Sequence, residues 1–183
     1  MGVSIHYSGQ LKNAALLPLL VEELEDIAKI LGWKSTSFLR NYPNNQFELL
    51  ASDDDYGIMV SPPECEPVIL VFDKEGYIYA PWLKQYFTDR FYIYNVSTKT
   101  QFAGADIHIV VVELMRHLSK KYLQNFTMID ETDYWETGNK GTVEEKISFL
   151  GNKINSFAAA LENTKMQEGE TLEDFIKRMA EGL

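Results

Sequence analysis

Short β-rich segments crowd the middle of this chain, between two long helical patterns. The first helical pattern covers residues 15–32 and the second covers 104–124, each with apolar residues at helical spacing. The segments between them are rich in β-branched and aromatic residues and lie at 33–40, 47–51, 57–61, 67–81 and 91–97. Strands that cluster in this way, instead of alternating with helices, predict the α+β class.

Two more strand patterns lie outside this middle region, at residues 3–8 and 126–130. In the first of them, Ile5 and Tyr7 alternate with His6, which predicts one buried and one exposed face. Together the patterns predict an antiparallel or mixed sheet with the two long helices packed on one face.

The last part of the chain predicts a helical appendage. Thr142 with Glu145 three residues later forms a capping box, and a last short helix starts near Thr171. We therefore divide the chain into an α+β domain at 1–140 and a C-terminal helical extension at 141–183, packed together as a single domain. The apolar stripe of the extension needs a partner surface, either this chain's own sheet or a second copy. Its members are Val143, Ile147, Leu150, Ile154, Phe157 and Leu161.

Composition narrows the classes of partner. The 183 residues can bury a real core, and the net charge of -10 argues against binding to nucleic acid or to anionic membranes. No apolar run approaches the ~20 residues that span a membrane. The one cysteine, Cys65, permits no internal disulfide, which fits a reducing compartment. We expect a cytoplasmic protein that binds neither nucleic acid nor a membrane.

One resemblance rests on two quoted segments. TQFAGADIHIVVVELMRHLSKKY at 100–122, followed by DYWETG at 133–138, resembles a group of bacterial proteins of about this length. The resemblance covers most of residues 3–155. No activity is assigned to that group, so the resemblance implies a bacterial protein and supplies no catalytic residue, cofactor or partner.

The segment DETDYWETG, at 130–138, gathers carboxylates beside two large aromatic rings. Asp130, Asp133 and Glu136 could supply the oxygen ligands that Mg²⁺ or Ca²⁺ prefers, although their spacing does not match an EF-hand loop. With Tyr134 and Trp135, the carboxylates could instead form a pocket for an ammonium or guanidinium group. The simpler alternative is a solvated loop that ends a strand.

A histidine could join this metal site only if the fold brings it close to the acidic segment. His6 lies on the first strand pattern and His108 on the second helix, and either could be a metal ligand or a general base beside the acidic segment. No phosphate-binding loop, dinucleotide fingerprint or nucleophile elbow is present. The chain therefore favours a protein without catalytic activity, and a metal-dependent hydrolase is the alternative.

Tyrosines are the most unusual feature of the β-rich region. Ile78 and Ile93 each stand between two tyrosines, so the tyrosines line the outer face of the sheet if the isoleucines face the helices. The four are Tyr77, Tyr79, Tyr92 and Tyr94. Such a face offers area and hydroxyl groups to a protein partner. The alternative is that the C-terminal helices or a loop cover it.

The leading hypothesis is a binding protein without a cofactor. It would bind a protein partner, or itself, through the tyrosine-rich face or through the acidic segment with Tyr134 and Trp135. A second hypothesis is a hydrolase with a divalent metal at Asp130, Asp133 and Glu136. A third is a small-molecule carrier with an apolar pocket between the sheet and the C-terminal helices.

Overall fold

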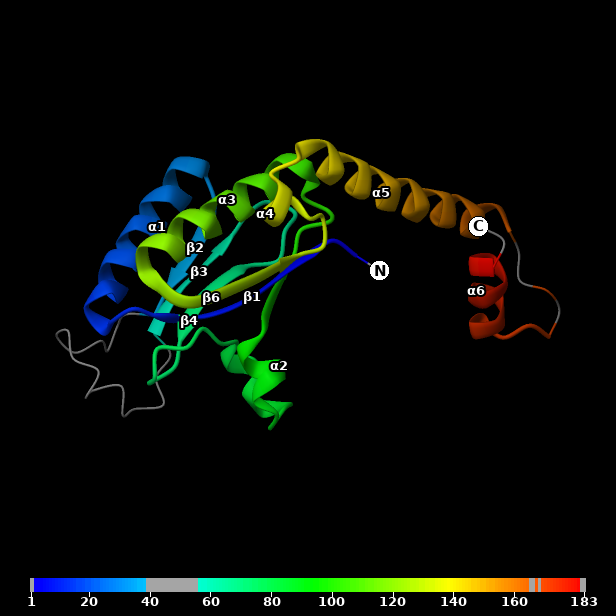
Figure 1. Ribbon diagram of the computed structural model, residues 1–183. Helices are drawn as coiled ribbons and strands as arrows, with labels where there is room; N and C mark the ends of the chain where they lie inside the picture. Colours follow the sequence, from blue (N-terminus) through cyan, green and yellow to red (C-terminus); the bar gives the residue numbers. More distant parts are fainter. Residues whose placement is uncertain (1, 39–55, 165–166, 168, 182–183) are drawn as a thin grey trace.

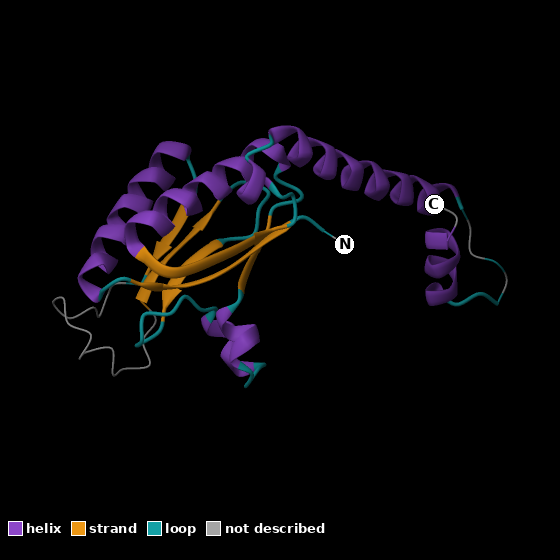
Figure 2. Ribbon diagram, in the orientation of Figure 1, coloured by secondary structure: helices purple, strands orange, loops and turns teal. Residues whose placement is uncertain are grey.

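The structure is a computed structural model that describes residues 2–38, 56–164, 167 and 169–181. It confirms the α+β class, with helices and antiparallel strands (Figures 1 and 2). The strands are β1 (Ser4–Leu11), β2 (Lys34–Ser37), β3 (Tyr56–Ser61), β4 (Val68–Phe72), β5 (Val96–Lys99) and β6 (Leu123–Asp130). The helices are α1 (Leu17–Leu31), α2 (Arg90–Tyr94), α3 (Gly104–Tyr122), α4 (Tyr134–Thr137), α5 (Lys140–Asn163) and α6 (Leu172–Glu181). The described residues also contain the 3-10 helices η1 (Ala14–Leu16) and η3 (Pro81–Gln85).

The strands form two small antiparallel sheets instead of the single sheet that the sequence predicted. One sheet has the order β5-β1-β6 and the other β2-β3-β4. Residues 76–79 join them, because Ile78 N–H donates to Gly9 of β1 and Tyr79 N–H donates to Val71 of β4, each over 2.9 Å. Tyr7 adds a buried link, since its hydroxyl accepts from the Ile69 N–H over 2.8 Å. The two sheets therefore share one core.

Helices α1 and α3 lie side by side over the strands and close that core (Figure 1). Leu17, Leu20 and Leu24 of α1 are fully buried, as the predicted stripe requires. Pro18 lies in the first turn, where its missing N–H is tolerated, and Gly32 ends the helix with φ 69°. The predicted alternation of the first strand is also confirmed, since its residues are buried and half-buried in turn.

Two sequence predictions about local structure are wrong. Residues 90–94 form helix α2 instead of a strand, and the strand begins only at Val96. The C-terminal helix begins at Lys140, where the Asn139 side chain accepts from the Gly141 N–H over 3.0 Å, so Thr142 is not its cap. The strand predicted at 47–51 lies outside the described residues.

The face of the β5-β1-β6 sheet that points away from α1 and α3 is an open sheet face. The outward side chains of β1 are half-buried and those of β6 are exposed. Most are small or polar, and two pairs bond across the strands: Ser8 with Thr127 over 2.9 Å and Gln124 with Gln10 over 3.0 Å. Short helix α2 lies below this sheet in Figure 1, away from α1 and α3.

Helix α5 leaves the body as an arm and carries α6 at its far end (Figure 1). Its first turns pack on α3, where Val143 is fully buried. Beyond that contact most of its described side chains are exposed. No helix in the described part of the chain is long and apolar enough to cross a membrane.

Candidate functional site

The acidic segment is organised around a carboxylate that is fully buried. Asp130 ends β6 and accepts hydrogen bonds from the N–H of Thr132 over 2.8 Å and the N–H of Trp135 over 3.0 Å. His108 of α3 places its Nε2 at 3.1 Å from the same carboxylate, and neither side chain is exposed to solvent. Asp130 thus fixes the turn that leads into α4, and it is not the solvated carboxylate that a surface loop would have.

Two threonines complete this buried group. The Thr132 hydroxyl lies 3.0 Å from His108 Nε2 and donates to Asp130 over 2.9 Å, while the Thr100 hydroxyl lies 2.7 Å from His108 Nδ1. Burial would raise the pKa of Asp130, but the hydrogen bonds from His108 and Thr132 outweigh it and lower the pKa to about 2. We call His108, Asp130, Thr100 and Thr132 the buried polar cluster.

The buried polar cluster is closed to a substrate. Asp130 and the Thr100 hydroxyl do lie against different ring nitrogens of His108, as the carboxylate and the nucleophile of a catalytic triad do. All four side chains are buried, however, so no substrate reaches them. We interpret the cluster as structural support for the acidic segment.

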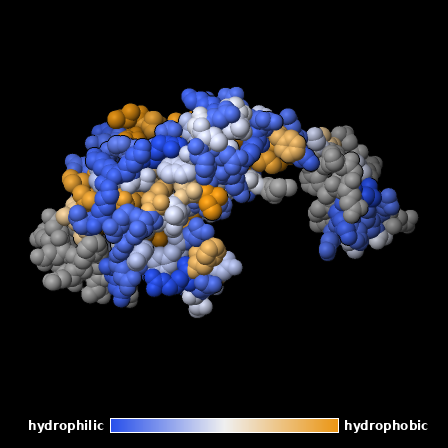
Figure 3. Space-filling model, viewed as in Figure 1, coloured by the Kyte–Doolittle hydropathy of each residue, from blue (hydrophilic) through white to orange (hydrophobic). Residues whose placement is uncertain are grey.

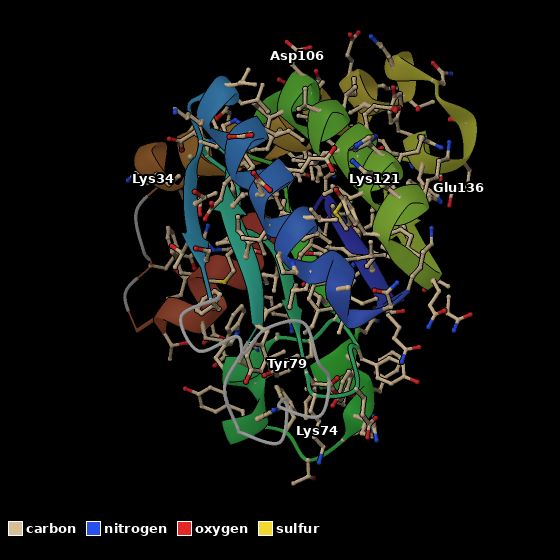
Figure 4. All side chains as sticks on the ribbon, turned by 90° about the vertical axis from the view of Figure 1, so that its left-hand side faces the viewer. Lys34, Lys74, Tyr79, Asp106, Lys121 and Glu136 are labelled. Carbon is tan, nitrogen blue, oxygen red and sulfur yellow. The ribbon has the colours of Figure 1, made fainter. Side chains whose placement is uncertain are left out.

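Asp133 and Glu131 contact basic side chains of the same chain. Lys146 of α5 lies 2.7 Å from the Asp133 carboxylate and donates to the Glu131 carbonyl over 2.7 Å. His6 Nε2 lies 3.9 Å from the Glu131 carboxylate. The His6 side chain is half-buried, whereas His108 is fully buried. Glu136 is exposed at the outer edge of the molecule (Figure 4). The acidic segment thus anchors the start of the α5 arm.

The metal ligands proposed from the sequence are therefore not brought together. Asp130 is enclosed with His108, Asp133 is paired with Lys146, and Glu136 is exposed on its own. Among the described residues, no three or more His, Cys, Asp or Glu side chains are placed to hold one metal ion.

The acidic segment was also a candidate for an aromatic pocket that binds a cation, and a cation of this chain already lies on its tryptophan. The Arg116 guanidinium lies 4.6 Å from the centre of the Trp135 ring and donates to the Trp135 carbonyl, while Tyr134 is buried.

A second charged group lies on the exposed side of α3. Arg116, His117, Lys120 and Lys121 line a hollow of about 390 Å³ together with Glu113. Glu23 of α1 lies 2.8 Å from both His117 and Lys121, and Tyr122 also donates to it. Burial opposes ionisation of Glu23, but the bonds from Lys121, Tyr122 and His117 lower its pKa to about 2. Glu23 thus links α1 to α3 beside this hollow, and His117 and Lys121 are already bonded within the chain.

The four tyrosines do not line the open sheet face together, contrary to the prediction. Tyr79 is 1% exposed and lies between the sheet and residues 81–95 (Figure 4). Tyr94 packs on both Tyr79 and Tyr77, with ring centres 6.0 and 6.1 Å apart, and its hydroxyl donates to Asp73 over 2.7 Å. The prediction failed because residues 90–94 are helical, so Tyr92 and Tyr94 project in different directions.

Residues 81–95 instead form an aromatic segment that protrudes from the body. Tyr92 stacks on Phe87 with ring centres 5.0 Å apart and meets the edge of Phe91 at 5.6 Å. Phe91 is 65% exposed, and Trp82 and Tyr86 are exposed as well. Apolar side chains are visible over this region in Figure 3. Several exposed rings side by side are unusual for a surface without a partner.

A groove of about 430 Å³ separates the aromatic segment from the open sheet face. Ser8 and Gly9 of β1 with Thr127 and Ile129 of β6 form its floor. Its walls are Tyr77, Ile78, Phe91, Tyr94, Asn95 and Asn125. None of the described residues that line it carries a charge, and Ile129 on its floor is 66% exposed. The groove offers apolar surface together with hydroxyl and amide groups.

Sequence reasoning missed most of this groove. Tyr77 and Tyr94 belong to it, as members of the predicted tyrosine set, but Ile129 and the two asparagines were not singled out. One signal was present: alternation along residues 126–130 places Ile129 on the same face as Thr127, where the neighbouring strand carries only polar residues.

No family model, curated protein or solved structure matches this chain. The resemblance to a bacterial group through residues 100–122 and 133–138 therefore stays a prediction.

Proposed function

We propose that this protein acts by binding a protein partner in the groove between the aromatic segment and the open sheet face. The observation that carries the proposal is the exposure of Ile129 on the floor and of Phe91 on the wall of one groove. Its volume of about 430 Å³ is in the range of ligand-binding pockets. Aromatic residues that surround a desolvated centre are typical of protein interfaces.

The lining favours a neutral, extended segment of the partner. The described lining has no lysine or arginine to contact phosphate groups, which argues against a nucleic acid. Hydroxyl and amide groups of Ser8, Asn95, Asn125 and Thr127 offer hydrogen bonds to a peptide backbone, while Phe91 and Ile129 offer apolar contact to a side chain.

The two alternative functions find less support in the same geometry. A hydrolase needs acid–base groups at the site where substrate binds, and the groove lining contains no carboxylate, imidazole or amine among the described residues. A carrier was expected to hold its ligand between the sheet and the C-terminal helices. The groove lies instead between the sheet and α2, and no residue of α5 or α6 lines it in the described part of the chain.

Affinity capture with matched variants tests the proposal. Full-length protein is immobilised as wild type, Phe91→Ser, Ile129→Ser and Ile30→Ser. Ile30 is the control because it is 82% exposed on α1, away from the groove. We expect the wild type and Ile30→Ser to retain the same partner, and each groove variant to bind it at least about tenfold more weakly, since each loses one apolar anchor. Equal capture by all four proteins would contradict the proposal.

A further inference from the structure

Helix α5 makes little contact with the body along most of its length. Its 24 residues extend for about 36 Å. Among the described residues, its contacts with the body lie in the first turns, where Val143 is buried and Lys146 bonds to the acidic segment over 2.7 Å. Figure 1 shows the rest of the helix projecting from the body. A helix without tertiary contacts is only marginally stable in water, so the projecting part needs a packing partner.

The sequence of α5 specifies what kind of partner it needs. Its apolar residues follow one another at intervals of four, three, four, three and four, which is a heptad repeat along one seam. We call this set the α5 seam: Val143, Ile147, Leu150, Ile154, Phe157 and Leu161. A heptad seam packs against another helix, because each apolar side chain inserts between four residues of the facing helix.

The middle of the α5 seam is uncovered in a single chain. Ile154 is 44% exposed. Figure 3 shows an apolar patch on the arm between hydrophilic side chains. Helix α6 folds back on α5 and buries Phe175 there, but its ten residues extend for only about 15 Å and leave Ile154 exposed.

A glycine beside the seam points to close approach by a second helix. Gly151 lies in the middle of α5, where glycine lowers helix stability by about 1 kcal/mol relative to alanine. A Cβ atom at this position would meet no other atom within 4 Å, so packing within one chain does not require a glycine. Gly151 follows Leu150 directly and leaves room for a neighbouring backbone at the exposed part of the seam.

We propose that the α5 seam pairs with the α5 seam of a second copy of this chain. The seam of Ile147, Leu150 and Ile154 is the same on every copy, as the self-complementary interface of a two-fold dimer requires. The half-buried Leu150 and the exposed Ile154 lie at the midpoint of Lys140–Asn163, so a two-fold axis across the helix there brings the uncovered part of each seam against the other in an antiparallel pair. A second copy is also present whenever the chain itself is present.

The oligomeric state of full-length variants tests this proposal. We expect light scattering after gel filtration to give the wild type twice the 21.0 kDa chain mass. Ile154→Glu places a charge in the seam and should give a monomer. Asn152→Glu places the same charge two residues away at an exposed position off the seam and should stay a dimer. Ile154→Ala keeps the helix and should raise the dimer dissociation constant at least about a hundredfold, because both copies lose a buried side chain.

Three results would overturn the proposal. The first is a monomeric wild type at the highest concentration reached, which would leave the seam to a different partner. The second is a dimer that Ile154→Ala and Ile154→Glu do not weaken. The third is a dimer that Asn152→Glu weakens as much as Ile154→Glu does. The groove variants Phe91→Ser and Ile129→Ser should leave the dimer unchanged, which separates this proposal from the proposed function.

Discussion

Replacing Asp130 by asparagine should destabilise the fold although the side chain keeps its size. The Asp130 carboxylate accepts from the N–H groups of Thr132 and Trp135 and from the Thr132 hydroxyl, over 2.8 to 3.0 Å. An asparagine amide would direct an NH₂ group at one of these donors. Bonds to a charged acceptor contribute about 1.5–3 kcal/mol each, and an unsatisfied buried donor costs about 1–3 kcal/mol. We expect the free energy of unfolding at pH 7 to fall by about 3 kcal/mol.

The pH dependence gives this prediction a second signature. The pKa of Asp130 is about 2 in the folded protein and 3.8 ordinarily, so the unfolded chain binds the proton more tightly. The carboxylate therefore stabilises the fold above about pH 4, and this contribution, about 2 kcal/mol, is lost as the pH falls through 2. The difference between wild type and Asp130→Asn should shrink by that amount over the same range.

Urea unfolding followed by tryptophan fluorescence, at pH 7 and at steps down to pH 2, measures both effects. Asp133→Asn is the matched control, because its side chain is 64% exposed and its single ion pair with Lys146 contributes less than about 1 kcal/mol. The reasoning is refuted if Asp130→Asn loses no more stability than Asp133→Asn, or if its loss does not change with pH.

Three further predictions concern the core and the aromatic segment. Gly57→Ala should prevent stable folding, because at φ 141° a Cβ atom would lie 2.0 Å from the Leu70 carbonyl oxygen, and soluble expression measures this. Burial, and then the charge of Glu66, raise the pKa of Cys65 to about 12. Its reaction with a thiol reagent at pH 8 should therefore be about a thousandfold slower in native than in urea-unfolded protein. Similar rates would contradict the raised pKa of this half-buried thiol. Tyr94→Phe removes the 2.7 Å hydrogen bond to Asp73 and should lower the free energy of unfolding by about 1–2 kcal/mol. An unchanged free energy of unfolding would show that the hydroxyl is solvated instead.

The sequence predicted those elements whose local signals agree with their tertiary environment. Helix α1 has a regular leucine stripe, a proline in its first turn and Gly32 at its end, so periodicity and end signals gave the same bounds. Strand β1 alternates strictly because only one of its faces is buried. In such elements the burial that stabilises the fold also sets the pattern along the chain.

Helix α2 shows where local signals are too short. Three alternating residues cannot distinguish a strand from one helical turn, and Ile93 is buried in either case. The Asp89 side chain, which accepts from the Phe91 N–H over 2.9 Å, is the cap that begins the helix. That signal lies just outside the aromatic pattern. A strand at residues 90–94 would place Tyr92 and Tyr94 on one face, and the helix does not.

The buried polar cluster shows a different limit. Residues 107–112 are apolar on several sides, so the stripe of α3 could be placed in more than one phase. In the structure, the buried face of α3 includes His108 together with Val111, Val112 and Met115. A buried imidazole needs hydrogen-bond partners, and Thr100 and Asp130 come from segments before and after the helix. No pattern within the helix reveals them.

Cross-linking from inside the groove tests the central claim most directly. A photoreactive phenylalanine analogue replaces Phe91 in the full-length protein in its own cells, and the same residue replaces Ile30 as the control. If the groove binds a protein partner, irradiation should join a distinct protein to the chain from position 91 and not from position 30. The account is contradicted if position 91 gives no adduct, or the same adducts as position 30.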